Sequence, residues 1–225
     1  MTSNTVDRGT VLVTGASRGL GKALAALYAA DGFRVIACMR QAAAGAEPLD
    51  VADAASIAAL GERLEGEPVD IVINNAAIRG DTGGLASLET ENFLEVMRIN
   101  ALAPLLVARA LRSNLLAGSR KVLVNIGSRA GSLAEGTMDD ADGDYAYRCS
   151  KAALNMATLT LARDLRADGI AVISLHPGWV RTDMGGAEAA VDVRESAAGL
   201  KALIDGTTMA ETGSFRAYDG RTVAW

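Results

Sequence analysis

Short runs of apolar, mostly β-branched residues recur along this chain and alternate with longer segments that have helical spacing. The runs lie at residues 10–14, 34–39, 69–74, 121–126 and 170–175, and the helical segments at 20–30, 53–64, 92–116 and 147–166. A continuous apolar strand has no polar side, so it must be buried on both faces of its sheet. Strands of this kind that alternate with helices predict an α/β protein with a doubly wound parallel sheet in three αβα layers. We expect residues 1–225 to form a single domain.

A glycine-rich segment, VLVTGASRGLG at residues 11–21, follows the first of these runs and fits two patterns. Gly15, Ser17 and Gly19 fit G-x-S-x-G, the nucleophile elbow of a serine hydrolase. Gly15, Gly19 and Gly21 also fit a turn that brings a pyrophosphate to a helix N-terminus. A hydrolase needs earlier strands to supply its oxyanion loop, and this turn follows the first strand. The phosphate interpretation is favoured, and it predicts a dinucleotide-binding Rossmann fold.

Charge, cysteine content and hydropathy argue against several other classes of protein. Half of the residues are hydrophobic, but no apolar run approaches the roughly 18 residues of a membrane span. The first residues lack the basic start and apolar stretch of a secretion signal. The net charge is -5 with no basic cluster, and Cys38 and Cys149 lie far apart in the sequence. We therefore expect a cytoplasmic protein that binds no metal, nucleic acid or membrane.

Further motifs follow the later strands. They are NNAA at 74–77, Asn100, VNIGS ending at Ser128, YAYRCSK with Tyr147 and Lys151, and PGWVRT at 177–182. Together with the glycine turn, these motifs resemble the short-chain dehydrogenase/reductase family in order and spacing from end to end. Within the family, the segments YRCSKAALN, HPGWVRTDMGG and YDGRTVAW are most similar to sniffer-type carbonyl reductases and C-factor-like proteins.

The chemistry of the catalytic group can be argued from its residue types. Lowering a tyrosine pKa by about three units takes roughly 4 kcal/mol, and one cation about 4 Å away supplies about as much at an effective dielectric near 20. Lys151, one helical turn after Tyr147, is expected to be that cation. Ser128 is expected to hold the substrate oxygen against the Tyr147 hydroxyl. The family resemblance gives Asn100 the task of holding a water in a proton relay with Lys151.

Two nearby residues compete for catalytic roles. Tyr145 lies two residues before Tyr147, but Cys149, and not a lysine, follows it at four residues. Tyr145 is therefore expected to line the substrate cleft or to pack there. His176, the only histidine, ends a strand and is expected to be structural.

The second strand favours NADP over NAD. A NAD site places an acid about 20 residues beyond the glycine turn, and none occurs between Gly32 and Ala46. Arg40 and Arg18 instead suit the 2′-phosphate, and the resemblance places Asp50 at the adenine. The cofactor contacts expected from motif and resemblance are Gly15, Ser17, Arg18, Gly19, Leu20, Gly21, Arg40, Asp50, Val51, Asn74, Ala76, Tyr147, Lys151, Pro177, Gly178, Val180 and Thr182.

The expected function is the reversible NADPH-dependent reduction of aldehydes or ketones, with Tyr147 as the acid–base group. The alternative is a nucleotide-binding regulatory protein of the same fold with negligible turnover. The resemblance also implies a homodimer or homotetramer, formed by the helices at 92–116 and 147–166 through Leu105, Leu106, Met156 and Leu159. The chain departs from the family pattern at Ala77, where NNAG has glycine, and at 41–47, a connection too short for a crossover helix.

Overall fold

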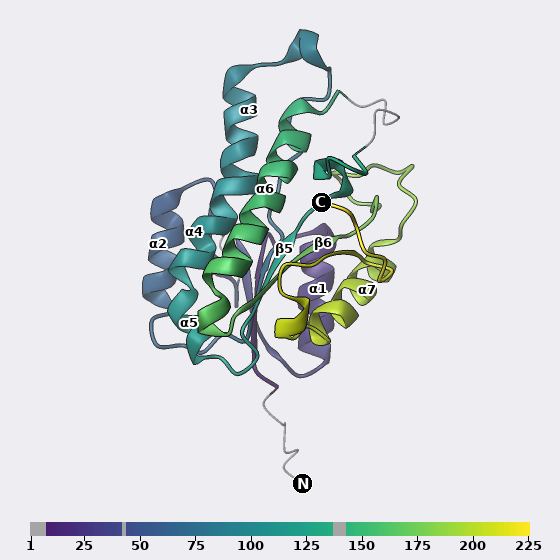
Figure 1. The fold of residues 1–225 in the computed structure, drawn as a ribbon. Coiled ribbons are helices and arrows are strands. Elements are labelled where there is room, and N and C mark those ends of the chain that lie inside the picture. Colours follow the sequence, from purple (N-terminus) through teal and green to yellow (C-terminus); the bar gives the residue numbers. More distant parts are fainter. Residues whose placement is uncertain (1–7, 42–43, 137–142) are drawn as a thin grey trace.

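The central element is a parallel sheet of seven strands in the order β3-β2-β1-β4-β5-β6-β7 (Figure 1). The computed structural model describes residues 8–41, 44–136 and 143–225. The strands are β1 (Thr10–Thr14), β2 (Arg34–Met39), β3 (Glu47–Pro48), β4 (Ile71–Asn74), β5 (Val122–Ile126), β6 (Ala171–His176) and β7 (Phe215–Ala217). All five predicted strands are present, and those predicted at 69–74, 121–126 and 170–175 begin one or two residues later. The predicted doubly wound α/β fold is confirmed.

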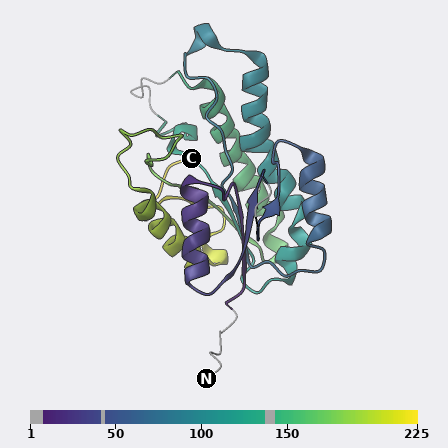
Figure 2. The ribbon, with the colours of Figure 1, turned by 180° about the vertical axis from the view of Figure 1, so that it is seen from behind.

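Helices cover both faces of the sheet (Figures 1 and 2). One layer holds α1 (Gly19–Ala30) and α7 (Val193–Asp205), and the other holds α2 (Ala54–Arg63), α3 (Thr90–Met97), α4 (Ala103–Ala110), α5 (Arg112–Ala117) and α6 (Tyr145–Asp164). Successive strand side chains point to opposite faces, so Leu12 joins one core cluster while Val11 and Val13 join the other. In the described part of the chain, no helix is long and apolar enough to cross a membrane.

The helix predicted at 92–116 is present over residues 90–117, but it is interrupted at two places. A π-helical turn at Arg98–Leu102 separates α3 from α4, and Leu111 separates α4 from α5. Pro104 gives a physical reason for the first interruption, since it has no N–H to donate to the carbonyl four residues earlier. That carbonyl belongs to Asn100, which therefore lies in the widened turn.

The short connection from β2 to β3 is possible because β3 pairs only with the end of β2. Cys38 lies opposite Glu47, and Met39 lies opposite Pro48. A full parallel crossover usually needs a dozen or more residues. Two-residue pairing at the carboxyl end of β2 needs only a loop, as the sequence predicted.

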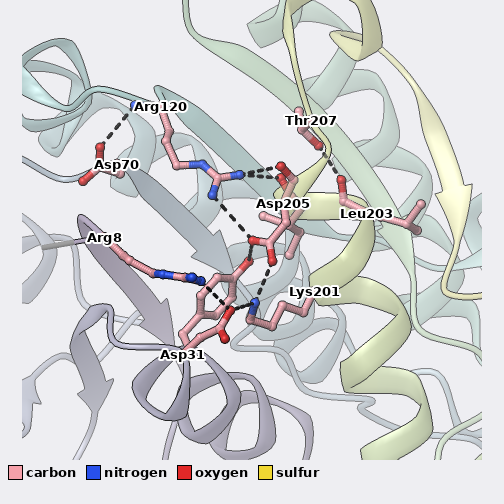
Figure 3. Close-up of polar contacts among 10 residues, drawn as sticks. Arg8, Asp31, Asp70, Arg120, Lys201, Leu203, Asp205 and Thr207 are labelled. Carbon is pink, nitrogen blue, oxygen red and sulfur yellow. Dashed lines mark hydrogen bonds and ion pairs between the residues drawn. The ribbon is translucent and has the colours of Figure 1, made fainter. Parts of the chain in front are cut away.

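A network of charged side chains lies at the amino ends of the strands, where α1 and α7 both end (Figure 3). Asp31 and Asp205 stand at the C-termini of these helices, where the helix dipole disfavours a negative charge. Lys201 Nζ donates to both carboxylates at 2.6 Å and lies 4.8 Å from the ring centroid of Tyr28. Arg120 Nη1 lies 3.6 Å from Asp205 Oδ1. The network joins the ends of α1 and α7.

Candidate active site

A cavity of about 830 Å³ lies at the carboxyl ends of the central strands. Its walls come from the segments that follow β1, β2, β4, β5 and β6. In an open parallel sheet, this edge is where ligands bind. Residues far apart in the sequence therefore face one another across a single space.

The glycine turn between β1 and α1 forms one wall of the cavity. Gly15 and Gly19 have positive φ angles of 67° and 54°, which glycine adopts without steric cost. A Cβ on Gly15 would lie 2.9 Å from the Cα of Ala76, and a Cβ on Gly21 would lie 2.4 Å from the carbonyl oxygen of Gly15. The Arg18 side chain, at the N-cap of α1, makes no capping hydrogen bond. The turn therefore fits a phosphate, which can approach the backbone and the helix N-terminus closely.

The NNAA segment contributes Asn75, and not Asn74, to the cavity. Asn74 ends β4 with its side chain buried, and its Nδ2 donates to Oδ1 of Asn125 at 3.0 Å. Asn75 points the other way, and its Nδ2 donates to the carbonyl oxygens of Thr14 and Gly15 at 2.9 and 3.2 Å. The structure therefore places Asn75, and not the predicted Asn74, on the cavity wall, because neighbouring side chains on a strand point to opposite faces.

The alanine that replaces the family glycine causes no backbone strain. Among the described residues, Lys121 is the only non-glycine residue with a positive φ, so Ala77 has an ordinary backbone angle. Its methyl group lines the cavity wall.

Tyr147 and Lys151 come from the first two turns of α6 and line the cavity together. Lys151 is buried, and its Nζ donates to the carbonyl oxygen of Ile126 at 2.8 Å and lies 5.6 Å from the Tyr147 ring centroid. Burial lowers the pKa of Lys151 to about 8, so the ammonium is charged at neutral pH. The predicted spacing on one helix face therefore brings the phenol and the ammonium together.

The proton on the phenol is held more tightly than the sequence suggested. Burial raises the pKa of Tyr147, while a hydrogen bond with Ser128 and the charge of Arg79 oppose the rise. The expected lowering of the Tyr147 pKa by Lys151 is therefore not found in this structure. A phenol that keeps its proton suits the donation of a proton to a carbonyl oxygen.

Ser128 lies at the end of β5, in the same wall. Its Oγ accepts a hydrogen bond of 3.1 Å from the backbone N–H of Ala130, which fixes the oxygen at the start of a short 3-10 turn. Its hydroxyl also forms a hydrogen bond with the Tyr147 side chain, so the two hydroxyl groups are in contact. Ser128, Tyr147 and Lys151 thus share one wall of the cavity, as the motifs predicted.

Asn100 does not line the cavity, and its side-chain amide is hydrogen-bonded within the protein. Its Oδ1 accepts from the N–H of Ile78 at 2.9 Å, and its Nδ2 donates to Ile78 O at 2.8 Å and to Ser150 Oγ at 3.0 Å. Ser150 Oγ in turn donates to the carbonyl oxygen of Tyr147 at 2.7 Å. The amide of Asn100 therefore joins the loop after β4 to α6. The expected role of Asn100 in holding a relay water stays a prediction.

The far end of the cavity holds the residues expected at the adenine and its ribose. Arg40 is exposed and forms no ion pair within the described segments, whereas Arg18 pairs with Asp183 at 2.6 Å. Asp50 Oδ1 accepts from the N–H of Ala52 at 2.9 Å, which fixes the turn after β3. The other predicted contacts that line the cavity are Ser17, Leu20, Val51, Ala76, Pro177, Gly178, Val180 and Thr182.

The serine hydrolase interpretation finds no support in the geometry. Ser17 follows β1 and His176 ends β6, and β4 and β5 lie between these strands. Parallel strands are about 4.8 Å apart, so the two residues start about 14 Å from each other. His176 Nδ1 accepts from the backbone N–H of Arg129 at 3.4 Å, and burial lowers the pKa of His176 to about 4. His176 is therefore neutral at neutral pH.

The sequence analysis missed several residues of the cavity. Arg79 and Asp144 line it beside Tyr147, and Trp179 and Met184 provide apolar surface. Arg79 lies just beyond the NNAA motif and Asp144 just before the tyrosine motif, so their positions next to known motifs were the available signal. The described residues contain no group of three or more His, Cys, Asp or Glu side chains that could hold a metal ion.

Comparisons with known proteins agree with this arrangement. Residues 9–194 match the family described as short chain dehydrogenase. C-signal of Myxococcus xanthus is 42% identical over 158 residues, which cover 70% of this chain and 93% of that protein. The 1-hydroxy-2-glutathionyl-2-methyl-3-butene dehydrogenase of Rhodococcus sp. (strain AD45) is 36% identical over 230 aligned positions, which cover 96% of this chain and 99% of that protein.

Two solved structures have the same fold over nearly the whole chain. The NADPH-bound carbonyl reductase from chicken fatty liver superposes with a TM-score of 0.88 at 32% identity, covering 98% of this chain and 100% of that chain. The carbonyl reductase Sniffer of D. melanogaster superposes with a TM-score of 0.89 at 27% identity, covering 96% of this chain and 99% of that chain.

Proposed function

The chain belongs to the short-chain dehydrogenase family of oxidoreductases, and on this premise we propose that it reduces aldehydes or ketones with NADPH. The observation that carries the proposal is the shared wall formed by Ser128, Tyr147 and Lys151, in a cavity that also contains the glycine turn. The chicken carbonyl reductase of the same fold is an NADPH-bound enzyme, which supports the choice of cofactor and reaction.

Residues at one end of the cavity would bind the cofactor phosphates, and residues at the other end would transfer the proton. The glycine turn and the N-terminus of α1 would bind the pyrophosphate, and Arg40 with Arg18 would bind the 2′-phosphate. NADPH supplies the hydride when it is bound. Tyr147 gives its proton to the carbonyl oxygen, which Ser128 holds in place. The charged Lys151, fixed by the Ile126 carbonyl, stabilises the phenolate left after the transfer.

The function is tested by following NADPH oxidation with a panel of aldehydes and ketones. We expect turnover of several reactive carbonyl compounds, and reversal with the corresponding alcohols and NADP. A protein that binds NADPH but turns over no member of the panel would favour the regulatory alternative. An intact tyrosine, serine and lysine group favours the enzyme, because a nucleotide sensor does not need a phenol placed for proton transfer.

Arg40→Asp is expected to shift cofactor preference from NADPH toward NADH. The change removes a cation from the 2′-phosphate and places an acceptor near the ribose hydroxyls. The ratio of kcat/KM for the two cofactors should fall at least about tenfold, which corresponds to about 1.4 kcal/mol. Arg109→Asp, on the exposed side of α4, is the control and should leave the ratio unchanged. If the ratio is also unchanged in Arg40→Asp, either Arg18 makes the contact with the 2′-phosphate or the protein does not prefer NADP.

We also propose that two or four chains assemble through the helical segment 92–116, which includes α3 and α4, and through α6; α3 and α6 lie side by side (Figure 1). Leu94 on α3, Leu102 at the end of the π-helical turn and Met156 on α6 are exposed. Of the four residues expected at the interface, Met156 is 66% exposed, while Leu105, Leu106 and Leu159 are partly buried and Leu106 packs against the core. Large exposed apolar side chains of this kind are typical of an interface between chains.

Light scattering should give a mass of at least twice the 23.2 kDa of one chain. Met156→Glu is expected to produce monomers, because it places a charge in the contact. Leu133→Glu is the matched control, since Leu133 is 92% exposed and lies outside both helices. A wild-type mass near that of one chain would contradict the assembly.

A further inference from the structure

An ion pair crosses the wall of the cavity next to Tyr147. Nε and Nη2 of Arg79 donate to Oδ2 of Asp144 at 3.0 and 2.8 Å, and Asp144 is only 5% exposed. The two residues are 65 positions apart in the sequence. Arg79 belongs to the loop after β4, and Asp144 immediately precedes α6. The pair therefore joins two segments that both border the wall formed by Ser128, Tyr147 and Lys151, which we call the catalytic wall.

Asp144 occupies the N-cap position of α6 but does not cap the helix. An aspartate at this position usually accepts a hydrogen bond from the N–H of the second or third helical residue. The Asp144 side chain makes no such bond, although the third helical residue is Tyr147. Its second oxygen, Oδ1, is buried and has no hydrogen-bond partner in the segments that the structure describes. The carboxylate is thus directed to Arg79 and not to its own helix.

Other contacts join the same two segments on either side of the ion pair. Gly83 and Gly143 form a parallel β-bridge, and a Cβ on Gly143 would lie 2.3 Å from the Cα of Gly84. On the other side of Arg79, Ile78 is connected to α6 through the amide of Asn100. The loop after β4 is therefore attached to the start of α6 at three successive points. The ion pair of Arg79 with Asp144 is the charged contact among them.

The two charges act on Tyr147 in opposite directions. Burial is the main cause that raises the Tyr147 pKa, the positive charge of Arg79 lowers it, and the negative charge of Asp144 raises it further. Asp144, at the N-cap of α6, stands three residues before Tyr147, and both residues line the cavity. The effects of the two charges on the phenol therefore oppose each other.

The remaining ionisable groups of the catalytic wall come from four elements. Arg148 and Lys151 belong to α6, and Arg129 lies in the turn after β5. His176 ends β6 and is neutral at neutral pH, and Arg221 follows β7. Arg129 and Arg221 lower the pKa of His176, which places their charges near that ring.

We propose that Arg79 and Asp144 are positioning residues for proton transfer, which hold the first turn of α6 against the loop after β4 and balance the charge around the Tyr147 hydroxyl. The proposal rests on the proposed function only for the role of Tyr147 as proton donor. The ion pair and its effect on the phenol are properties of the protein without substrate, so they can be measured separately from turnover.

The direct test is a pH titration of the Tyr147 phenol by NMR of protein labelled with ¹³C at the tyrosine Cζ. The chain has four tyrosines, and Tyr147→Phe assigns the resonance. Arg79→Gln should raise the Tyr147 pKa and Asp144→Asn should lower it, each by about half a unit or more. The double variant Arg79→Gln/Asp144→Asn should return close to the wild-type value. Arg79→Lys keeps the positive charge and should shift the pKa least.

A matched control is available in the same chain. Arg112 forms an ion pair of the same kind with Asp168, with Nε and Nη2 at 2.7 Å from the two carboxylate oxygens, and neither residue lines the cavity. Arg112→Gln should leave the Tyr147 titration unchanged. The proposal is supported if the Tyr147 pKa shifts in opposite directions in Arg79→Gln and Asp144→Asn and does not change in Arg112→Gln. Shifts in the same direction, or no shift, would overturn it.

A second measurement uses the pH profile of kcat/KM, with NADPH and 4-nitrobenzaldehyde as the probe carbonyl. The limb assigned to Tyr147 should move to higher pH in Arg79→Gln and to lower pH in Asp144→Asn. If Arg79→Gln fails to fold by circular dichroism, Asp144→Asn and the double variant decide. Recovery in the double variant indicates balanced charges, whereas a double variant no better than either single one overturns the proposal. Failure of turnover alone, with opposite NMR shifts, would contradict the reductase function and not the pair.

Discussion

Tyr147→Phe is expected to lower kcat for carbonyl reduction by roughly three orders of magnitude. The substitution removes only the hydroxyl that donates the proton. The ring remains, with Lys151 Nζ still fixed by the Ile126 carbonyl, so the wall of the cavity should keep its shape. The dissociation constant for NADPH, measured by fluorescence titration, should therefore stay within about threefold of the wild-type value.

Tyr145→Phe is the matched control for this change. Tyr145 is exposed, does not line the cavity and begins the same helix. Its variant should keep nearly full activity and the same affinity for NADPH. Activity retained in Tyr147→Phe, or lost in Tyr145→Phe, would show that the proton donor has been assigned to the wrong tyrosine.

Gly21→Ala is expected to raise the dissociation constant for NADPH by at least about tenfold and to destabilise the protein by about 1–3 kcal/mol. Gly21 lies inside α1, where alanine normally favours a helix by about 1 kcal/mol over glycine. Here the added Cβ would lie 2.4 Å from both Gly15 O and Asn75 Nδ2. A backbone oxygen cannot move aside without distorting the glycine turn, so the sign of the effect is reversed.

Calorimetric titration with NADPH and thermal unfolding measure the two effects of Gly21→Ala. Gly206→Ala provides the control, since Gly206 has a φ of -85° and its new Cβ would meet its nearest neighbour at an ordinary 3.6 Å. That variant should bind NADPH like the wild type. Wild-type affinity in Gly21→Ala as well would mean that the close packing of the turn is not needed for binding the cofactor.

The central strands could be predicted because they are continuous, mostly β-branched apolar runs, which must be buried on both faces of the sheet. Their order in the sheet was not predicted. The C-terminal elements α7 and β7 escaped prediction for different reasons. Helix α7 is amphipathic, with only four buried side chains at Ser196, Ala197, Leu200 and Ile204. Strand β7 has three residues and lies at the edge of the sheet, so its sequence carries too short a pattern.

The site shows a similar division. Tyr147 and Lys151 were found because their spacing on one helix face is local in the sequence. The choice between Asn74 and Asn75 depends on which way each side chain leaves the end of β4, and the NNAA motif alone does not decide it. The pairing of Arg79 with Asp144 depends on the folded positions of two loops 65 residues apart, and no local pattern records such a contact.

The charged network around Lys201 (Figure 3) lies at the C-termini of α1 and α7, at the opposite end of the sheet from the cavity. Helix α1 is thus held at its C-terminus by α7 and offers its N-terminus to a ligand. Mutations that reshape the loops at the carboxyl ends of the strands leave this anchor untouched. With this arrangement, successive substitutions around the cavity can change the substrate during evolution without preventing the chain from folding.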